Sequence, residues 1–206
     1  MFVPKRFESS IPWPQLLAQH DFGMLLTADA GELFTSHVPY LADPDARTLS
    51  LHLARANPHW RAIERQPRCR FVVQGAHGYV SPSWYETPQA VPTWNYQAVH
   101  VEGTATLEFD EARLRELLRR MVARFEDPGN APAWALESLS EEFLRPRLRS
   151  IVGVTLRVEN GEAKQKLSQD RSPSERERIV RELRARDNEE LARAMASISS
   201  IDPAPA

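Results

Sequence analysis

Apolar and polar residues alternate in several short stretches of this chain, and this period of two predicts β-strands. The clearest cases are TLSLHLA (48–54), in which three leucines share one face, and the long stretch 94–109. Turn-forming residues separate the stretches, including DAGE (29–32) and the hairpin-forming pair Asn160-Gly161. We expect around seven strands, at 22–29, 33–41, 48–54, 69–75, 78–85, 94–109 and 151–158, with a second hairpin arm at 162–168.

Glycine positions add two local expectations. A tight turn is expected between residues 75 and 78, because glycines flank this point of the sequence. Gly103 interrupts the long alternating stretch and is expected to form a β-bulge.

Spacings of three and four between apolar residues predict one clear helix. Asp110 caps it, and large apolar side chains recur on one face from 114 to 125. Arginines and glutamates occupy the other positions, so we expect that side of the helix to face solvent.

End signals predict the other helices. Asn57 caps a helix that ends before Pro67, and the S-x-x-E sequence beginning at Ser138 opens a short helix over 138–144. A short helix is expected at 14–20, and a last, exposed helix runs from Ser172 to about residue 197. These elements describe an α+β fold, a β-barrel with peripheral helices. We expect one domain over 1–170, with the C-terminal helix and an Ala/Pro tail over 171–206.

The composition excludes several classes of function. A formal net charge of −2 over 206 residues gives no overall attraction to nucleic acid or to anionic membranes. No apolar segment is long enough for a membrane span or a secretory signal, so a cytoplasmic location is expected. The single cysteine, Cys69, excludes an intramolecular disulfide. It lies between two arginines and is either a mildly activated thiol or, as we expect, a buried core residue.

The stretch from His77 to Gly103 concentrates the candidate binding residues. It holds three of the four tyrosines and two of the five tryptophans, interleaved with hydroxyl and amide side chains. Aromatic rings beside short hydrogen-bonding groups suit a flat, partly polar ligand. The same composition is also common at the edge of a β-rich core, and both interpretations stay open.

A second candidate lies where the strand 48–54 meets the following helix. Arg55 and the start of the helix at Asn57 direct a guanidinium and free backbone N–H groups toward one point, which is typical of an anion site. The alternative is that Arg55 is a surface charge and that water satisfies the N–H groups.

Catalytic chemistry finds little support. Five of the six histidines lie on separate predicted elements, without metal-ligand spacing: His37, His52, His59, His77 and His100. Ser81 and Ser83 lack the sequence of a nucleophile elbow. No Gly-rich nucleotide motif of the Rossmann or P-loop type occurs, and we predict no catalytic residue and no metal.

Five phrases in order carry a resemblance that covers nearly the whole chain: HLARANPHW (52–60), GYVSPSWY (78–85), VPTWNY (91–96), VHVEG (99–103) and KLSQDR (166–171). Together they resemble the PaiB-like FMN-binding negative transcriptional regulator family. This resemblance implies a split β-barrel related to pyridoxamine phosphate oxidases. It also implies a homodimer with FMN bound at the subunit interface, in two symmetric copies. The chain departs from the family at Asp170, where an asparagine is usual; if this carboxylate faces the phosphate, FMN binding is weakened.

The resemblance and the residue chemistry together assign FMN contacts. Phosphate contacts are expected around Arg55 and the helix start, and further polar contacts in the last phrase. Ring contacts are expected from the aromatic stretch, and ring or ribityl contacts from the second strand. The expected cofactor-binding residues are Thr35, Ser36, His37, Arg55, Asn57, His59, Trp60, Ser81, Ser83, Trp84, Tyr85, Trp94, Asn95, Tyr96, Lys166, Ser168 and Gln169.

Three functions follow from this resemblance. The first is an FMN-binding regulatory homodimer, and DNA contact is not supported by charge or by a recognisable motif. The second is a flavin-dependent oxidoreductase that uses the same pocket. The third is a haem-binding split barrel with a histidine ligand.

Overall fold

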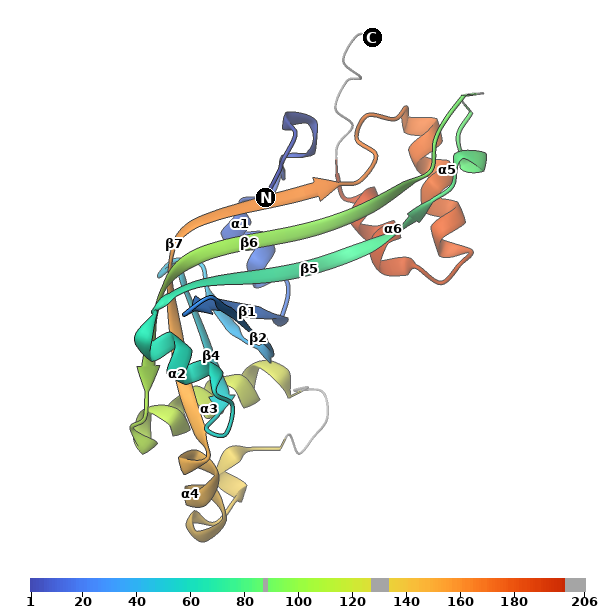
Figure 1. Ribbon diagram of the computed structural model, residues 1–206. Helices are drawn as coiled ribbons and strands as arrows, with labels where there is room; N and C mark the ends of the chain where they lie inside the picture. Colours follow the sequence, from blue (N-terminus) through green and yellow to red (C-terminus); the bar gives the residue numbers. More distant parts are fainter. Residues whose placement is uncertain (87–88, 127–133, 199–206) are drawn as a thin grey trace. The chain divides into compact units, whose positions relative to one another are not determined.

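The computed structural model describes residues 1–86, 89–126 and 134–198. Its strands form a seven-stranded sheet with the order β2-β1-β5-β6-β7-β4-β3 (Figure 1). The bounds are β1 Phe22–Asp29, β2 Glu32–Pro39, β3 Leu41–Asp43, β4 Thr48–Ala54, β5 Arg68–Val80, β6 Thr93–Glu108 and β7 Ile151–Lys166. The expected α+β class is confirmed.

Helices connect and cover the strands. The α-helices are α1 Trp13–Ala18, α2 His59–Arg65, α3 Glu111–Phe125, α4 Glu141–Arg149, α5 Pro173–Arg184 and α6 Glu189–Ala196. Three short 3-10 helices are η1 Lys5–Phe7, η2 Pro82–Trp84 and η3 Leu136–Ser138. No helix in the described ranges is long and apolar enough to cross a membrane.

The chain divides into two compact units, each of which is described by itself. Unit 1 comprises Met1–Leu16, Val73–His100 and Glu162–Ala206, and unit 2 comprises Leu17–Val72 and Val101–Gly161. Strands β5, β6 and β7 contribute residues to both units. The boundary expected at residue 170 coincides with neither unit and stays a prediction.

Unit 2 is built on the β1/β2 hairpin and the β4–β7 pair. Asp29 pairs with Glu32 across the hairpin turn, where Ala30 and Gly31 take φ values of 49° and 85°. This left-handed pair confirms the turn expected at DAGE. In the core, the Tyr40 ring meets the Phe71 ring edge-on at 4.8 Å.

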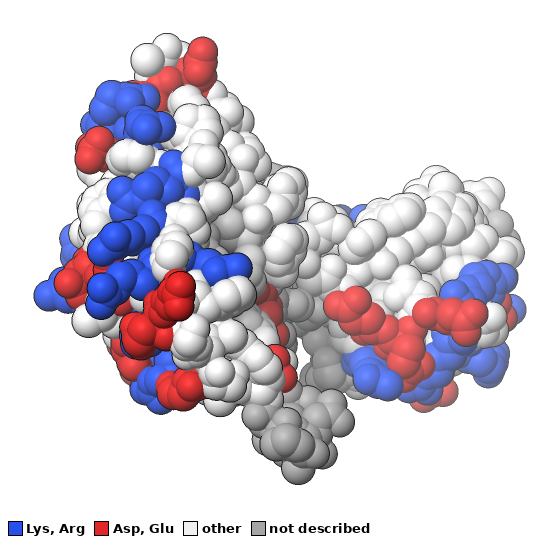
Figure 2. All heavy atoms as spheres, turned by 90° about the horizontal axis from the view of Figure 1, so that it is seen from below, with Lys and Arg blue, Asp and Glu red and all other residues white. Residues whose placement is uncertain are grey.

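Helix α3 has the expected cap and faces. The Asp110 carboxylate accepts a hydrogen bond from Arg113 N at 3.0 Å, and the helix buries Leu114 and Met121. Its arginines pair with acidic neighbours, as Arg115 does with Glu141 at 2.7 Å. Figure 2 shows basic side chains bordering acidic ones on the face drawn there.

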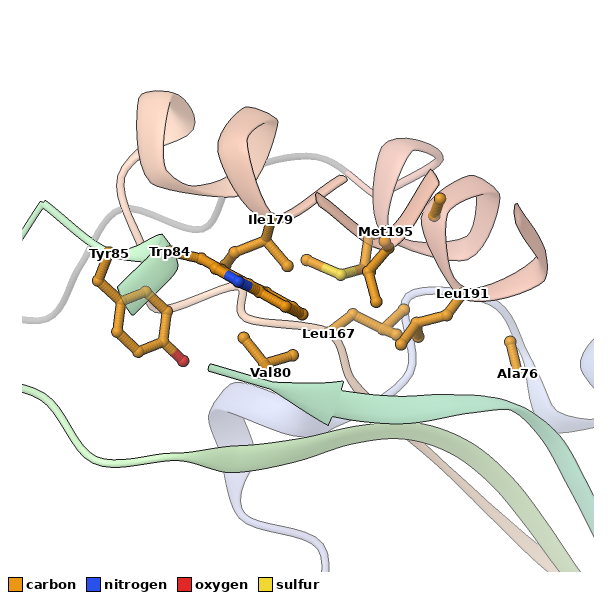
Figure 3. Packing of buried hydrophobic residues seen from close by; sticks show 10 residues of the cluster. Ala76, Val80, Trp84, Tyr85, Leu167, Ile179, Leu191 and Met195 are labelled. Atoms are coloured by element: carbon orange, nitrogen blue, oxygen red, sulfur yellow. The ribbon is translucent and has the colours of Figure 1, made fainter. Parts of the chain in front are cut away.

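Unit 1 has its own core beneath helices α5 and α6. Figure 3 shows Trp84 lying flat between α5 and the end of β5, with Val80 below it and Met195 beside it. Ala76, Leu167, Ile179 and Leu191 complete the labelled part of this cluster. Ten buried residues make up the cluster, and five of them come from α5 and α6, so one face of these helices is packed on unit 1.

Two of the expected turns are wrong. Strand β5 continues through residues 75–78 and the chain does not reverse there. Gly75 and Ala76 are both buried, so the alternation of buried and exposed residues shifts by one position at this point. Strand β7 continues through Asn160-Gly161 to Lys166, with no hairpin. Both strands are hydrogen bonded to β6 in the sheet, so pairing with a neighbouring strand overrides the local turn preference.

Helix ends in the C-terminal half differ from the prediction. Ser140, two residues after the expected Ser138, caps α4 by accepting a hydrogen bond from Phe143 N at 3.3 Å. The last helix begins after Ser172 as expected, but it breaks between α5 and α6. Asp187 takes a φ of 58° at the break, and the Asn188 side chain caps α6.

Gly103 is required by a close approach between strands. A Cβ at this position would lie 1.9 Å from the carbonyl oxygen of Arg157 on β7. The residue lies within continuous strand, so the expected bulge is replaced by a steric reason for the glycine.

We predict that Gly103→Ala destabilises the protein by at least about 3 kcal/mol, because two backbones have to move apart. Gly31→Ala is the matched control, since nothing lies within 4 Å of a Cβ there and only the φ of 85° opposes it. The control is expected to cost about 1 kcal/mol. Equal losses of unfolding free energy in urea titrations of the two variants would contradict the steric explanation.

Candidate functional site

Strand β2 separates the three candidate residues that it carries. Ser36 points inward and is 8% exposed, whereas Thr35 and His37 lie on the exposed face of the strand. His37 stacks against Phe22, with ring centroids 6.4 Å apart. The alternation of side chains along a strand therefore brings only Ser36 to the buried residues of unit 2.

A buried chain of hydrogen bonds starts at Asn57. Its Nδ2 donates to Ser36 Oγ at 2.9 Å, and Ser36 Oγ lies 2.8 Å from His59 Nδ1. On the other side of the imidazole, Nε2 lies 3.0 Å from Thr27 Oγ1, which lies 3.1 Å from Cys69 Sγ. Ser36 Oγ accepts a hydrogen bond from the Asn57 amide. We therefore assign the Ser36 hydroxyl as the donor to His59 Nδ1, and the protonated His59 Nε2 as the donor to Thr27 Oγ1.

The groups in this chain are neutral at pH 7. Burial lowers the pKa of His59 from 6.5 to about 4. Burial raises the pKa of the Cys69 thiol, and the hydrogen bond from Thr27 only partly opposes this. Cys69 is 2% exposed, which confirms a core cysteine and excludes an activated thiol.

The corner between β4 and α2 presents Arg55 beside this chain. Asn57 Oδ1 accepts from His59 N, the first residue of α2, at 3.0 Å, but the N-cap position is Pro58, one residue after the expected Asn57. Trp60 Nε1 donates to the Arg55 carbonyl at 2.8 Å, and the exposed Arg55 guanidinium lies 5.1 Å from the centroid of the Phe109 ring. No ion pair of Arg55 is found in the described part of the chain, so its charge is available to an anion.

A small cavity of about 240 Å³ in unit 1 collects a second group of candidates. Four of the expected residues line it, namely Tyr85, Asn95, Lys166 and Ser168. Six further lining residues were not expected: Arg6, Phe7, Val91, Thr93, Asp170 and Arg171. We call this feature the unit 1 cavity. It places Asp170, the departure from the family sequence, among three cationic side chains.

Asn95 is the most buried polar group of the unit 1 cavity, with 0% exposure. Its Nδ2 donates to Ser168 Oγ at 2.9 Å and contacts Met195 Sδ at 3.4 Å. Its Oδ1 has no hydrogen-bond partner within the described residues. A buried acceptor without a donor is rare in proteins, so this atom marks the cavity as a place for a ligand.

The other aromatic candidates have separate surroundings. Trp84 is 6% exposed and belongs to the core of unit 1. Trp94 is 50% exposed, stacks on His77 at 6.0 Å and meets Tyr79 edge-on. Tyr96 lies 5.1 Å from the Lys164 ammonium. Only Trp94 among these three offers a largely exposed ring face.

The remaining candidates make local hydrogen bonds. Ser81 Oγ and Ser83 Oγ lie 2.8 Å apart at the start of η2. Gln169 is 4% exposed and accepts from Leu167 N at 2.8 Å, so it orders the chain after β7. The contacts of these three residues with FMN stay predictions.

The histidines form no metal site within the described residues, where no group of three or more His, Cys, Asp or Glu side chains could hold an ion. Both ring nitrogens of His59 have protein partners. His52 is partly buried; burial lowers its pKa, and its Nδ1 has no partner among the described residues. A haem ligand among the histidines, His100 included, stays a prediction.

Comparison with known proteins extends the geometry to a family. The family described as "Putative FMN-binding domain" matches residues 1–160. The chain is 34% identical over 195 residues to "Protease synthase and sporulation protein PAI 2" of Bacillus subtilis, and the match covers 91% of each chain.

Solved structures support the fold. The flavocytochrome Anf3 of Azotobacter vinelandii superposes with a TM-score of 0.57 at 17% identity, over 74% of this chain and 65% of that chain. The FAD and heme binding protein of Mycobacterium smegmatis gives a TM-score of 0.57 at 16% identity, over 77% and 72%. These likenesses confirm the split-barrel class expected from the sequence. The match over residues 1–160 and the identity with the Bacillus protein show that this chain belongs to the FMN-binding family of PaiB-like proteins, whose cofactor is FMN.

Proposed function

We propose that this protein is a homodimeric FMN-binding regulatory protein that holds the flavin at the interface between its two subunits. The family match supports the cofactor, and the name of the Bacillus relative supports a regulatory role. The structural observation that carries the proposal is the Arg55 corner, where an exposed guanidinium lies beside a buried, neutral chain of hydrogen bonds.

The Arg55 corner suits the FMN phosphate. The phosphate is an anion that needs a cation and several hydrogen-bond donors, and a guanidinium presents paired donors to such a group. Arg55 supplies the charge, and Asn57 is held next to it by its bonds to Ser36 and to His59 N. Bound FMN would supply a redox-active ring system that absorbs visible light.

The dimer is supported by exposed apolar side chains. In unit 1, Trp94 and Tyr79 are 50% and 48% exposed and contact each other edge-on. Exposed aromatic groups of this kind are common at protein interfaces. A second copy of the chain would cover them.

Direct DNA binding is not part of the proposal. The arginines of the C-terminal helices lie among acidic partners, as Arg186 does with Glu182 at 2.5 Å and Arg184 with Glu189 at 3.2 Å. Such pairs cancel the charge that phosphate backbones would need.

A flavin-dependent oxidoreductase remains the alternative, because it would use the same cofactor. Adding NADH or NADPH to the FMN-loaded protein separates the two. Bleaching of the flavin followed by reoxidation with a substrate supports the enzyme, and an inert flavin supports the regulatory protein.

We predict that Arg55→Met weakens FMN binding by about tenfold to one hundredfold, because a charge-assisted hydrogen bond to the phosphate is lost. Flavin fluorescence during titration measures the affinity. Arg61→Met is the control, since this arginine lies on α2, just after the corner, and its guanidinium is over the Trp60 ring at 4.5 Å. If both variants bind FMN like the wild type, the phosphate is held elsewhere.

The neutral state of His59 predicts a dependence of stability on pH. Its pKa of about 4 in the folded protein lies below the ordinary value of 6.5, so the unfolded chain takes up the proton first as pH falls. The stabilisation of the folded state by neutral His59 is complete above pH 6.5. It is lost progressively between pH 6.5 and 4, and the total loss of unfolding free energy is on the order of 3 kcal/mol.

The imidazole C–H resonances in an NMR titration of the FMN-free protein report this pKa directly. Urea titrations at pH 7, 5 and 4 measure the loss of stability. A His59 pKa near 6.5 would show that the imidazole does not link Ser36 to Thr27 as a buried neutral group.

The subunit arrangement predicts a sedimenting mass of twice the chain mass of 23.5 kDa. Sedimentation equilibrium of the FMN-loaded protein at micromolar concentration measures it. A single species of 23.5 kDa with flavin bound would contradict the interface site and leave the FMN site itself in place.

A further inference from the structure

The unit 1 cavity is smaller than the cofactor of this family requires. Its volume is about 240 Å³, and pockets for cofactors and drug-sized ligands usually measure roughly 300–1,000 Å³. The space enclosed by this one chain is therefore smaller than FMN with its ribityl phosphate. The cavity matches a ligand of a few heavy atoms.

The charged groups of the cavity favour an anion. Arg6, Lys166 and Arg171 contribute three positive charges, and Asp170 contributes one negative charge. The net charge of these four side chains is therefore two positive charges, which matches a dianion. Both Lys166 and Arg171 lie against aromatic rings, the Lys166 ammonium 5.8 Å from the Phe7 centroid and the Arg171 guanidinium 4.1 Å from the Tyr85 centroid.

The neutral groups of the cavity indicate that the ligand also carries a hydrogen-bond donor. The two contacts of Asn95 Nδ2, with Ser168 and Met195, fix which way the amide faces. The amide oxygen is therefore the atom left without a donor among the described residues. A hydroxyl group on the ligand would supply that donor.

Tyr85 closes one side of the cavity. Figure 3 shows its ring at the edge of the unit 1 core, with the hydroxyl directed away from Ile179 and Met195. Burial raises the pKa of this phenol, with the opposing effect of Arg171 smaller. The neutral phenol can donate a hydrogen bond to an anion.

We propose that the unit 1 cavity is a second ligand site, separate from the FMN site, that binds a small organic dianion carrying a hydroxyl group. Hydroxydicarboxylates and phosphate monoesters of small polyols share this chemistry. The site gives the protein a small-molecule ligand besides its cofactor, and it requires that FMN binds outside the unit 1 cavity. It reassigns Tyr85, Asn95, Lys166 and Ser168 from the cofactor to this ligand.

Isothermal titration calorimetry of the full chain, with and without FMN, tests the proposal. The probes are L-malate and glycerol 3-phosphate, with succinate and glycerol as matched compounds that lack the hydroxyl or the charge. We expect saturable binding of at least one dianion, at one site per chain. Binding of malate alone assigns a dicarboxylate, and binding of glycerol 3-phosphate alone assigns a phosphate monoester. If malate binds, we expect it to bind about tenfold more tightly than succinate.

Two variants locate the binding. Lys166→Met and Arg171→Gln are each expected to weaken it by at least about tenfold, because each removes a cation from the cavity. Lys5→Met is the control, since Lys5 belongs to the same unit but does not line the cavity. Because the two variants change different elements, a folding defect in one leaves the other informative.

Three outcomes would overturn the proposal. One is the absence of saturable binding for both dianions. Another is wild-type affinity in both variants. The third is displacement of FMN by either dianion in the loaded protein, which would show that the cavity is part of the cofactor site.

Discussion

The buried hydrogen-bond chain through neutral His59 organises unit 2. It joins four elements, because Asn57 and His59 belong to the start of α2, Ser36 to β2, Thr27 to β1 and Cys69 to β5. Burying polar groups is costly unless each one finds a partner, so the chain selects one register for β2 and one position for α2. A shift of β2 by one residue would bury Thr35 or His37 and leave the imidazole unmatched. Arg55 is exposed at the corner that these contacts define.

Unit 1 uses its aromatic residues in a different way. Trp84, which the sequence predicts as a contact of the flavin ring, instead fills the core beneath α5 and α6. The adjacent Tyr85 reaches the edge of that core and forms one wall of the cavity. The two interpretations left open for the aromatic stretch therefore both apply, to neighbouring residues. Tyr85 therefore belongs both to the core beneath the C-terminal helices and to the cavity wall.

Much of the fold follows from local sequence signals. The strands at 22–29 and 48–54 and the caps at Asp110 and Ser172 form where their patterns predict, because each depends on residues close in sequence. The turns predicted at 75–78 and at Asn160-Gly161 are wrong because strand pairing, not local sequence, decides the structure there. Strands β5 and β7 are both hydrogen bonded to β6, and no local pattern reports a partner strand that another part of the chain supplies.

The same limit applies to the candidate site. The alternation along β2 predicts that Ser36 is separated from Thr35 and His37, and β-strand periodicity alone could have found it. Thr93 and Arg171 lie in phrases that carry the family resemblance, but only the fold brings them and Arg6 to Asn95 and Lys166. Residues contributed by three separate segments are beyond pattern reading in a single sequence.

The most direct test of the central claim is a crystal structure of the protein with FMN bound. We expect the FMN phosphate within hydrogen-bond distance of the Arg55 guanidinium, beside Asn57, with no part of the flavin inside the unit 1 cavity. A phosphate held between Lys166 and Arg171 instead would contradict both the phosphate site and the second ligand site.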